Sequence, residues 1–483
     1  MRTARAETVA GDPRGAERRS AGPPWALVAV VLPAAGALLT RMRAIDLAYH
    51  VRTGETMLAS GALVRSDPYT FTVAGEPWTN QQWLAQAILA LGHRAASWAG
   101  VALVYALATG IGFSFLYAHC RRRGATERTA AVLALLGFIV STGPAPRPQA
   151  LAVPLFTATG LLLSRRDRWT WLVPVLAAIW ANVHGSFVLA PVLVGLLVVE
   201  DVLERRSPGR SGALLAATVL ATFVTPFGAG VWAYALDIAR DDTIRHFVAE
   251  WRPPSLTTVS GAAFWASGVA VVLVGLARRR AIRMIDVARL LVFFALAAPA
   301  VRGTLWWALL APTVLAGWFA VPSDMLARRR RRPDAAAIVA AVCILSLLPL
   351  AFLLRGGTDP VTGAPRRLAA DAPEVLVDTV RASVPRGSRL FVYQPFASWF
   401  EYSLPSDPVM VDSRIELYPD RVWSDYDHAI AAADGWERIL VDHGAVAVIL
   451  PPDAVLRPKL TRTSDWTLVS DGPAGSVFVR ATP

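Results

Sequence analysis

The chain has 483 residues, and its 48 Lys and Arg against 36 Asp and Glu give a formal net charge of +12. Hydrophobic residues make up 54% of the chain and charged residues only 17%, whereas a soluble domain carries roughly 25% charged residues. This composition, with only two cysteines, excludes a water-soluble globular enzyme, a disordered chain and a disulfide scaffold, and it predicts a polytopic α-helical membrane protein.

Residues 1–23 precede the first apolar run without a clear small-residue cleavage site, so we predict a disordered cytoplasmic tail rather than a removed signal peptide. Apolar runs near the ~20 residues needed to cross a bilayer then recur through residues 24–354. We expect about eleven transmembrane helices there, with an extra short helix at 83–93. The expected spans are 25–40, 98–119, 129–143, 149–164, 169–182, 186–203, 211–225, 257–277, 284–300, 304–321 and 335–354.

Arginine clusters occur at every second connection between the expected spans. Because Lys and Arg mark cytoplasmic loops, these connections and the N-terminus are predicted to lie in the cytoplasm, in a multi-pass protein of the plasma (inner) membrane. Topology and contact with membrane lipid then explain the positive charge, and no nucleic acid is needed as a partner. The clusters are at 121–128, 165–168, 204–210, 278–283 and 328–332.

After eleven spans and a linker at 355–365, residues 366–483 are predicted to lie outside the cell. Asp, Glu and Pro become frequent there, and the hydrophobic runs shorten to strand length. The segment is long enough for its own core, so we expect a small C-terminal extracytoplasmic α/β domain. Strands are expected at Leu390–Tyr393, Val409–Asp412, Val446–Leu450, Trp466–Ser470 and Val477–Arg480, and helices at Asp371–Val384, Pro419–Ala432, Gly435–His443 and Asp453–Leu460.

Acids, amides, histidines and aromatic residues gather in the connections on the predicted external side, beginning with a long first external loop at 41–97. Ionisable groups cost about 2.5–3.5 kcal/mol at the centre of a membrane and less near its surface, so they usually face a cavity or a partner. We therefore expect a concave polar site at the outer membrane surface. Its candidate substrate-binding residues are Arg52, Glu55, Gln82, Arg147, Gln149, Asn182, His184, Glu250, Trp251 and Arg302.

A helix from Asp46 to Leu58 in the first external loop would place Asp46 and His50 one turn apart. Its apolar residues would let it lie along the membrane interface with its polar side upward. A carboxylate beside an imidazole suits general base catalysis, or it supplies two ligands for a divalent cation such as Mg, Mn or Ca. Asp46 and His50 are therefore candidate catalytic residues and candidate metal ligands. The alternative is that Asp46 only caps the helix and His50 titrates in water.

Arg147 and Arg302 lie in short external turns. Their guanidinium groups fit a clamp on a phosphate group, and the alternative is that they snorkel to the lipid headgroups. Glu250 and Trp251 fit a sugar site, in which the acid binds hydroxyls and the ring stacks, or an anchor at the membrane interface.

Two further groups are compatible with either a site or a structural role. Asn182 and His184 stand at a helix end, where they contact a ligand or are satisfied packing residues. Asp412, Arg414 and Glu416 follow a predicted strand, where they reach a ligand or form a salt-bridged strand end.

These motifs together resemble the GT-C class of membrane glycosyltransferases, and in particular a bacterial and actinobacterial branch with a C-terminal extracytoplasmic α/β domain. The resemblance spans most of the chain in short pieces. The matching residues are Asp46-x-x-x-His50-x-Arg52-x-Gly54-Glu55, Asp67-Pro68-Tyr69-x-Phe71-Thr72, Pro77-Trp78, Gln82-Trp83-Leu84, Arg147-Pro148-Gln149, Asn182-x-His184-Gly185, Glu250-Trp251 and Val411-Asp412-Ser413-Arg414-x-Glu416-Leu417-Tyr418.

The resemblance implies an inverting transfer of a sugar from a polyprenyl-phosphate carrier to a glycan, lipid or protein acceptor of the cell envelope, on the external face. In that class an acidic residue of the first external loop is the base or a metal ligand, and Asp46 occupies this position. The chain departs from the class where a second acid is common beside Asp46, and where Gln81-Gln82 replace a His-Glu pair. Either departure fits a metal-independent or an inactive protein. A non-catalytic membrane scaffold and a transporter of lipid-linked glycans are therefore the alternatives.

Overall fold

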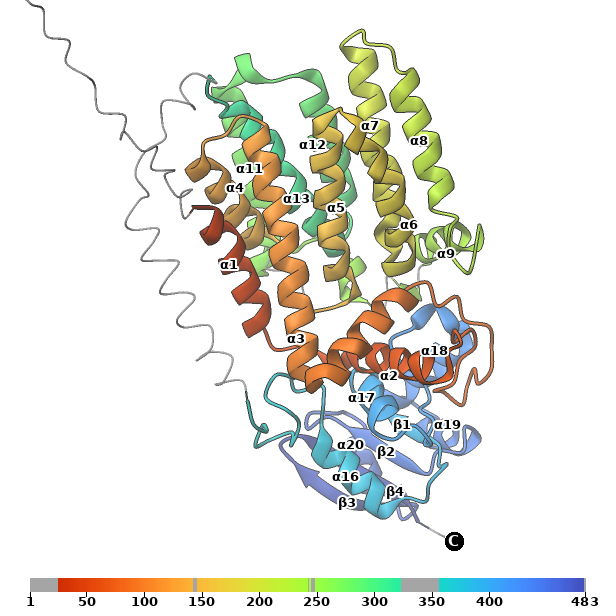
Figure 1. The fold of residues 1–483 in the computed structure, drawn as a ribbon. Coiled ribbons are helices and arrows are strands. Elements are labelled where there is room, and N and C mark those ends of the chain that lie inside the picture. The colour runs from red at the N-terminus through yellow and green to blue at the C-terminus, as the bar shows by residue number, and fades with distance from the viewer. Residues whose placement is uncertain (1–24, 142–145, 242, 245–247, 323–355, 482–483) are drawn as a thin grey trace, which may run out of the picture.

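The computed structural model describes residues 25–141, 146–241, 243–244, 248–322 and 356–481. The predicted tail at 1–23, the Arg cluster at 328–332 and the predicted span at 335–354 lie outside these residues. In the described part of the chain, a helical bundle is followed by an α/β unit that covers one end of it (Figure 1).

Helices occupy the predicted spans that fall within the described residues, and α9 is an additional helix that the sequence does not predict. Three helical segments in this part are long and apolar enough to cross a membrane: α3, Gly185–Leu203 and Val259–Ala277. The total of eleven spans therefore stays a prediction. The bundle helices are α1 (Trp25–Leu39), α3 (Trp83–Arg122), α4 (Glu127–Val140), α5 (Pro148–Arg165), α6 (Val173–Val183), α7 (Leu189–Leu203), α8 (Gly209–Ala221), α9 (Gly230–Arg240), α11 (Val259–Ala277), α12 (Met284–Ala297) and α13 (Val301–Trp318).

Helix α3 bends at Ser97, whose backbone takes a left-handed φ of 52°. The bend separates the predicted short helix at 83–93 from the span that follows it. Two glycines allow the two arms to approach, because a Cβ atom on Gly100 would lie only 1.9 Å from the carbonyl oxygen of Gly92. Helix α3 therefore begins in the first external loop and continues through the bundle.

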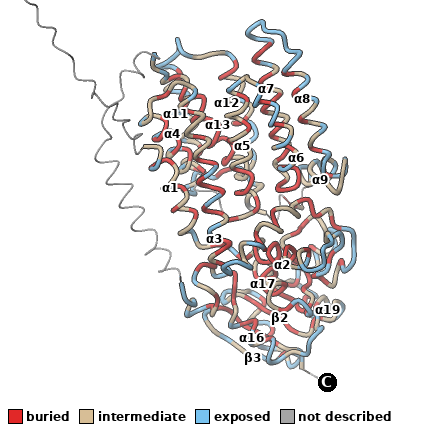
Figure 2. The backbone as a smooth tube through the Cα atoms, viewed as in Figure 1, coloured by how far each residue is buried: buried red, intermediate tan, exposed pale blue. Residues whose placement is uncertain are grey.

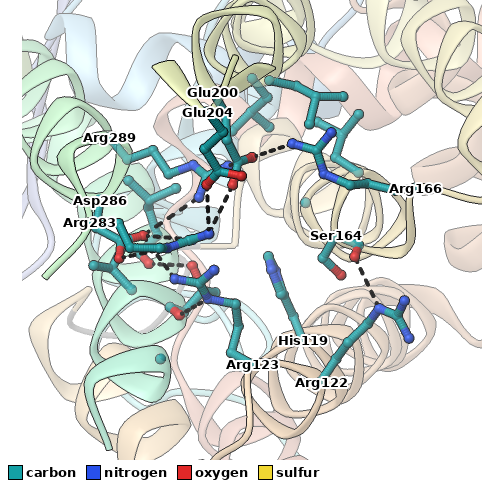
Figure 3. A pocket seen from close by; sticks show the side chains of 18 of the residues that line it. His119, Arg122, Arg123, Ser164, Arg166, Glu200, Glu204, Arg283, Asp286 and Arg289 are labelled. Carbon is teal, nitrogen blue, oxygen red and sulfur yellow. Dashed lines mark hydrogen bonds and ion pairs between the residues drawn. The ribbon is translucent and has the colours of Figure 1, made fainter. Parts of the chain in front are cut away.

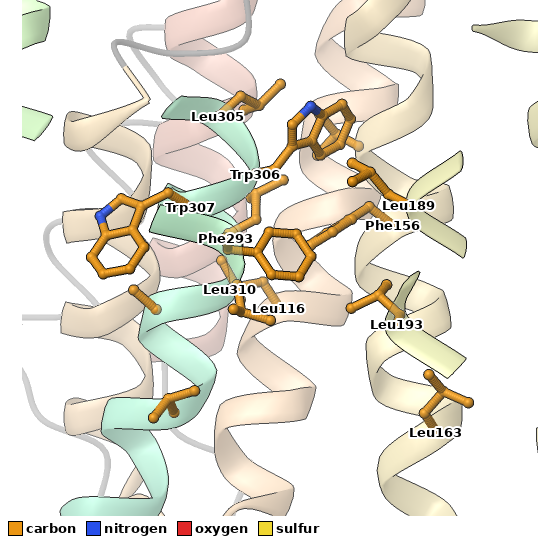
Figure 4. Packing of buried hydrophobic residues seen from close by; sticks show 14 of the residues in the cluster. Leu116, Phe156, Leu163, Leu189, Leu193, Phe293, Leu305, Trp306, Trp307 and Leu310 are labelled. Carbon is orange, nitrogen blue, oxygen red and sulfur yellow. The ribbon is translucent and has the colours of Figure 1, made fainter. Parts of the chain in front are cut away.

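Aromatic rings and small residues form the core of the bundle (Figure 4). Phe156 of α5 packs edge-on against Phe293 of α12, with ring centroids 5.6 Å apart, and Trp306 of α13 lies 5.2 Å from the Phe156 ring. Gly112 of α3 faces α5 so closely that a Cβ atom there would come within 2.5 Å of the Val153 side chain. Close packing of this kind holds helices together where lipid provides no hydrophobic driving force between them.

Residues 41–97, which the sequence predicts to be the first external loop and for which we keep that name, contain α2 (Ala44–Ser60), as the sequence predicts. The surroundings of α2 differ from the prediction, because its polar side does not face upward into solvent. The helix is held between α3 and α17 (Gln394–Ser403) of the α/β unit, and Leu47, Val51 and His50 are all buried. α3 and the α/β unit thus cover α2 from two sides, and His50 on its polar side lies against Gln86 of α3.

The α/β unit is built on a four-stranded sheet with strand order β1-β2-β4-β3. β1 and β2 are parallel, with Phe391 opposite Val448, and β4 runs antiparallel to both β2 and β3. This arrangement has the α/β character that the sequence predicts. The strands are β1 (Leu390–Val392), β2 (Ala447–Leu450), β3 (Trp466–Gly472) and β4 (Gly475–Arg480), and the helices besides α17 are α16 (Glu374–Ser383), α18 (Asp420–Ile430), α19 (Trp436–Asp442) and α20 (Arg457–Leu460).

Two elements of the α/β unit differ from the prediction. The segment Val409–Asp412 is not a strand, since Val409 makes only isolated bridges, to Thr70 of the first external loop and to β1. Helix α17 is not predicted by the sequence. Every residue from Phe396 to Glu401 is buried, including the polar Ser398 and Glu401, so burial here does not follow hydrophobicity.

The first external loop and the α/β unit share one continuous core, and buried backbone runs across their junction in Figure 2. The carboxylate of Asp371 accepts hydrogen bonds from the backbone N–H groups of Ala44 (3.0 Å) and Ile45 (3.2 Å), at the start of α2. The Ser398 hydroxyl of α17 accepts another from the backbone N–H of Tyr49 at 2.8 Å. The α/β unit therefore fixes the position of α2.

The arginine-containing connections at 121–128, 165–168, 204–210 and 278–283 lie at the end of the bundle away from the α/β unit (Figure 1). We call this end the arginine end, and the end covered by the α/β unit the outer end. The alternation of Arg clusters along the sequence predicts this separation. That the arginine end faces the cytoplasm stays a prediction.

Candidate functional site

Arg147 joins two carboxylates from distant segments at the outer end of the bundle. It precedes the first turn of α5, with an extended backbone (φ −142°, ψ 163°). Its Nε lies 3.3 Å from Oδ2 of Asp46 in α2, and its Nη1 pairs with the carboxylate of Glu250 in the turn Ala249–Trp251. We call these three residues the Arg147 cluster. Their side chains keep 21–34% of their surface exposed, so a ligand can reach them.

Arg302, in the first turn of α13, adds a second guanidinium group beside the Arg147 cluster. Its Cζ lies 5.1 Å from the centre of the Trp251 ring, a cation–π contact. The side-chain amide of Gln149 donates to the carbonyl oxygen of Arg302 at 3.2 Å. The Arg302 charge also interacts with all three charges of the Arg147 cluster. The predicted residues Gln149, Trp251 and Arg302 therefore lie with Arg147.

Asp46 is ionised at neutral pH. Burial raises the pKa of its carboxyl group, but the charges of Arg147 and Arg302 and the nearby Ser413 hydroxyl lower it, and the pKa is below its usual value. An ionised carboxylate that a ligand can reach is able to accept a proton. The role of base predicted for Asp46 is therefore compatible with its charge state.

His50 follows Asp46 by one turn of α2 and is only 3% exposed, which contradicts the alternative that it titrates in water. The amide Nε2 of Gln86 donates to Nδ1 of His50 at 3.1 Å, so the ring proton is on Nε2. Gln86 is held by paired amide hydrogen bonds with Asn80, both 2.8 Å long. Burial lowers the pKa of His50 to about 4, and the imidazole is neutral at pH 7.

His184, in the turn between α6 and α7, reaches the same region. Burial and the charge of Arg302 lower the pKa of its imidazole well below the usual value. The backbone N–H of Ser186 donates to Nδ1 of His184 at 3.1 Å, and the Ser186 hydroxyl lies 2.8 Å from the same nitrogen. The turn thus fixes the orientation of the His184 ring toward the outer end.

The α/β unit also contributes Ser413, which the sequence did not single out, and Glu416, for which the sequence left a ligand contact open. The hydroxyl of Ser413 lies near the Asp46 carboxylate, and the hydroxyl of Tyr234 in α9 donates to Oε1 of Glu416 at 2.7 Å. Burial raises the pKa of Glu416. The motif around residues 411–418 indicated this segment, but only the tertiary structure shows which of its side chains turn toward α2.

Arg414 belongs to a separate, fully buried network with Asp67, Asp412 and Glu401, which we call the Arg414 network. Its Nη2 lies 2.5 Å from Oδ1 of Asp67 in the first external loop, and its Nε donates to Oδ2 of Asp412 at 2.8 Å. The Trp78 ring lies 4.6 Å from the guanidinium carbon. Asp412 and Arg414 thus form the salt bridge that was the structural alternative for them, and it joins the loop to the α/β unit.

Glu401 carries a proton in this network. Burial and the nearby charge of Asp412 raise the pKa of Glu401 well above its usual value, while Arg414 chiefly keeps the pKa of Asp412 low. Neither carboxyl oxygen of Glu401 receives a hydrogen bond from a donor in the described residues. A protonated Glu401 that donates to Asp412 satisfies both groups.

Arg52 and Glu55 lie apart from the Arg147 cluster. Glu55 follows Asp46 by nine residues and therefore projects from the opposite side of α2. Its Oε1 lies 2.8 Å from Nδ1 of His93 in α3, and Arg52 is 4.0 Å from its other oxygen. The structure therefore does not bring these two residues to the site with Asp46.

Asn182 and Gln82 are placed at the edge of the site. Oδ1 of Asn182 accepts from the indole of Trp83 at 2.7 Å, and its Nδ2 donates to the carbonyl of Val224 at 2.9 Å. These contacts are those of a packing residue. Gln82 precedes α3, and its side chain makes no hydrogen bond with the described residues. A ligand-binding role for either residue stays a prediction.

The residues at the outer end fit a divalent cation poorly. The described residues contain no group of three or more His, Cys, Asp and Glu side chains arranged to hold a metal ion. Asp46 and His50 would supply two ligands, but Arg147 already lies 3.3 Å from the Asp46 carboxylate, where its positive charge opposes a cation. The metal role predicted for these two residues stays a prediction, and no reaction step below uses it.

The chain is similar in fold to solved structures of the oligosaccharyltransferase of Archaeoglobus fulgidus. The apo form matches with a TM-score of 0.54 and 12% sequence identity, over 89% of this chain and 70% of that enzyme. The same enzyme tethered by a disulfide bond to an acceptor peptide with the NVT sequon matches with a TM-score of 0.52 and 12% identity, over 89% and 69%. The sequence matches no protein-family model and no curated protein. This likeness is one of fold, and it supports the GT-C-like fold that the sequence predicts, whereas the bacterial branch is not shown.

Proposed function

We propose that this protein is an inverting glycosyltransferase of the plasma membrane. It moves a sugar from a polyprenyl-phosphate carrier to a glycan, lipid or protein acceptor on the external face. The observation that carries the proposal is the Arg147 cluster with Arg302 beside it, which together hold an ionised aspartate near two arginines at the outer end of a GT-C bundle. A donor whose apolar tail stays in the bilayer presents its phosphate at the headgroup level, where such a cluster would meet it.

In the proposed reaction, the acceptor hydroxyl attacks the anomeric carbon from the side opposite the phosphate. The bond from that carbon to the phosphate oxygen breaks, and its electron pair leaves with the phosphate. Asp46 accepts the acceptor proton, and Arg147 and Arg302 stabilise the departing negative charge. Glu250 holds Arg147 in place before the donor binds, and Trp251 offers a ring face to the sugar.

The test is transfer by the purified protein in liposomes supplied with radiolabelled polyprenyl-phosphate sugars. Asp46→Asn is expected to lower turnover by roughly 10²–10⁴-fold, because a general base contributes about that much. Arg147→Ala is expected to lower it by roughly 10²–10³-fold, as when one charge-stabilising donor is removed.

Two exposed residues of the α/β unit provide matched controls, since each also belongs to an ion pair. Asp378→Asn and Arg438→Ala should leave turnover unchanged. Equal turnover by wild type, Asp46→Asn and Arg147→Ala would remove the mechanism. A wild-type protein that consumes no donor, tested with hexosyl and pentosyl carriers, would favour the non-catalytic scaffold.

A further inference from the structure

A second polar region lies at the arginine end of the bundle, opposite the candidate site. It is a cavity of about 410 Å³ between α3, α5, α7, α12 and α13, shown in Figure 3. Cavities of about 300–1,000 Å³ are the usual size for small-molecule sites. This one is separate from the Arg147 cluster, and the proposed transfer reaction does not use it.

The lining of this cavity is strongly basic. Six arginines and three carboxylates face it, a formal excess of three positive charges. Asp201 lies behind the lining and pairs with Arg166 and Arg206, which leaves an excess of two. A cavity with this charge attracts an anion.

The carboxylates hold the guanidinium groups in fixed positions. Glu200 pairs with Arg166 at 2.8 Å, Arg289 at 2.9 Å and Arg283 at 3.0 Å. Asp286 pairs with Arg123 at 2.8 Å and with Arg283 at 3.1 Å. Because these contacts fix the arginines before any ligand arrives, little side-chain entropy is lost when an anion binds.

Two lining side chains, Arg122 and His119, are not paired with a carboxylate among the described residues. Arg122 donates only to carbonyl oxygens at the end of α5, those of Ser164 and Arg165, each at 3.2 Å. The His119 ring points into the cavity between Arg122 and Arg123 (Figure 3). The Arg122 charge also acts on the more distant Asp167, which pairs with Arg165, but no acid among the described residues lies within ion-pair distance of Arg122, so a ligand can pair with it.

The floor of the cavity is apolar. A smaller hollow continues from it toward the middle of the bundle and shares Gly160, Leu193 and Leu310 with it, adding Leu116 and Phe156. A polar mouth above an apolar floor fits a ligand whose anionic group carries an apolar substituent.

We propose that this cavity binds a phosphate group, with Arg122 as its main unpaired cationic contact. Guanidinium groups match the geometry of phosphate oxygens, and basic pockets between transmembrane helices bind phospholipid headgroups. The phosphate comes either from an anionic lipid of the adjacent leaflet or from a free phosphate ion. The apolar floor favours the lipid.

The experiment measures binding to the purified full-length chain. In the first arm, the protein is placed in phosphatidylcholine vesicles with and without phosphatidylglycerol, and retained lipid is counted by native mass spectrometry. In the second arm, inorganic phosphate is added in detergent and the unfolding temperature is followed. The variants are Arg122→Gln, Arg122→Lys and a control, Arg210→Gln, because Arg210 also donates to a backbone carbonyl at the same end.

We expect wild type to retain phosphatidylglycerol in preference to phosphatidylcholine. Arg122→Gln should weaken this retention roughly tenfold, since a charge-assisted hydrogen bond is lost, whereas Arg122→Lys should restore part of it and Arg210→Gln should match wild type. A rise in unfolding temperature with inorganic phosphate alone, abolished by Arg122→Gln, would assign the site to free phosphate.

The proposal would be overturned if wild type retained phosphatidylglycerol and phosphatidylcholine equally and its unfolding temperature did not change with inorganic phosphate. An equal loss of phosphatidylglycerol retention in Arg122→Gln and Arg210→Gln would overturn it as well, because the loss would then come from the lower positive charge of the surface in general. The unfolding temperature without ligand checks that Arg122→Gln folds. If it does not fold, Arg122→Lys is compared with wild type and Arg210→Gln instead, and retention of phosphatidylglycerol should still fall, because lysine lacks the guanidinium fork.

Discussion

Two arginines at the outer end each lie between carboxylates from distant segments, but their surroundings differ. The Arg147 side chain keeps 21% of its surface exposed, whereas that of Arg414 keeps 1%. A buried arginine cannot move to a ligand without leaving unpaired charges behind it. A partly exposed one is able to exchange a carboxylate for a phosphate. We therefore assign ligand binding to the Arg147 cluster and the joining of loop and α/β unit to the Arg414 network.

Arg414→Ala is expected to have the largest effect on stability. It leaves Asp67 and Asp412 buried without their cation, which costs about 3–5 kcal/mol in comparable buried pairs. Thermal unfolding of the purified protein, followed by tryptophan fluorescence, measures this loss. The control is Arg438→Ala, whose arginine is 86% exposed and should change stability by no more than about 0.5 kcal/mol. Equal unfolding temperatures for the two variants would contradict the assignment.

Arg147→Lys tests the same comparison through Arg147, where we expect a loss of turnover rather than of stability. Lysine keeps the positive charge but loses the planar fork that binds Asp46 and Glu250 together. Turnover should fall, by less than in Arg147→Ala, while stability changes by less than about 1 kcal/mol because the pairs are partly exposed. The transfer assay and thermal unfolding of the same preparation measure both quantities. A stability loss as large as that of Arg414→Ala would make the Arg147 cluster structural.

Glu401→Gln should change how stability depends on pH. The pKa of Glu401 is raised in the folded protein above the unfolded value of about 4.3, so between these two pKa values only the folded state binds the proton. Wild-type stability is therefore expected to fall as pH rises through that window. Glutamine still donates to Asp412 and does not titrate, so the variant should show a flatter profile. Unfolding temperatures of wild type and Glu401→Gln from about pH 5 to pH 9 test this. If the two proteins showed parallel profiles, Glu401 would be ionised in the folded protein over this range.

The smallest effect is expected for Arg52→Ala. The structure places Arg52 near Glu55, away from the Arg147 cluster, although the sequence made it a candidate for substrate binding. Turnover should change by less than about twofold, which corresponds to roughly 0.5 kcal/mol. A loss comparable to that of Arg147→Ala would show that the site extends along the far side of α2.

Elements with a one-sided or continuously apolar pattern could be predicted from the sequence. The bundle helices and α2 follow from apolar length and spacing, and β1, β2, β3 and β4 follow from short apolar runs. Helix α17 was not predicted in this way, because it buries the polar Ser398, which contacts α2, and the polar Glu401 of the Arg414 network. Val409 also lies in an apolar run, yet it makes only isolated bridges. The hydrophobicity of a segment does not determine whether it pairs along its length with a neighbouring strand.

The candidate site likewise has a part that could be predicted from the sequence and a part that could not. That Asp46, Arg147, Glu250 and Arg302 share one end of the bundle follows from the alternation of loops. The tertiary fold decides which of them form pairs. Arg147 pairs with Asp46 and Glu250, and Arg414 pairs with Asp67 at a sequence separation of 347 residues. No local spacing encodes such contacts. The cavity at the arginine end has the same origin, because its arginines were recognised only as signals of topology.

The start of α2 has a consequence for the order in which the protein is made. The carboxylate that caps the first turn of this helix belongs to Asp371, which is synthesised 327 residues after Ala44. The ribosome therefore finishes the whole bundle before the helix that carries Asp46 receives its cap. A nascent chain arrested before residue 371 has the aspartate but lacks the group that completes its helix, so the catalytic centre that we propose is among the last parts of the molecule to mature.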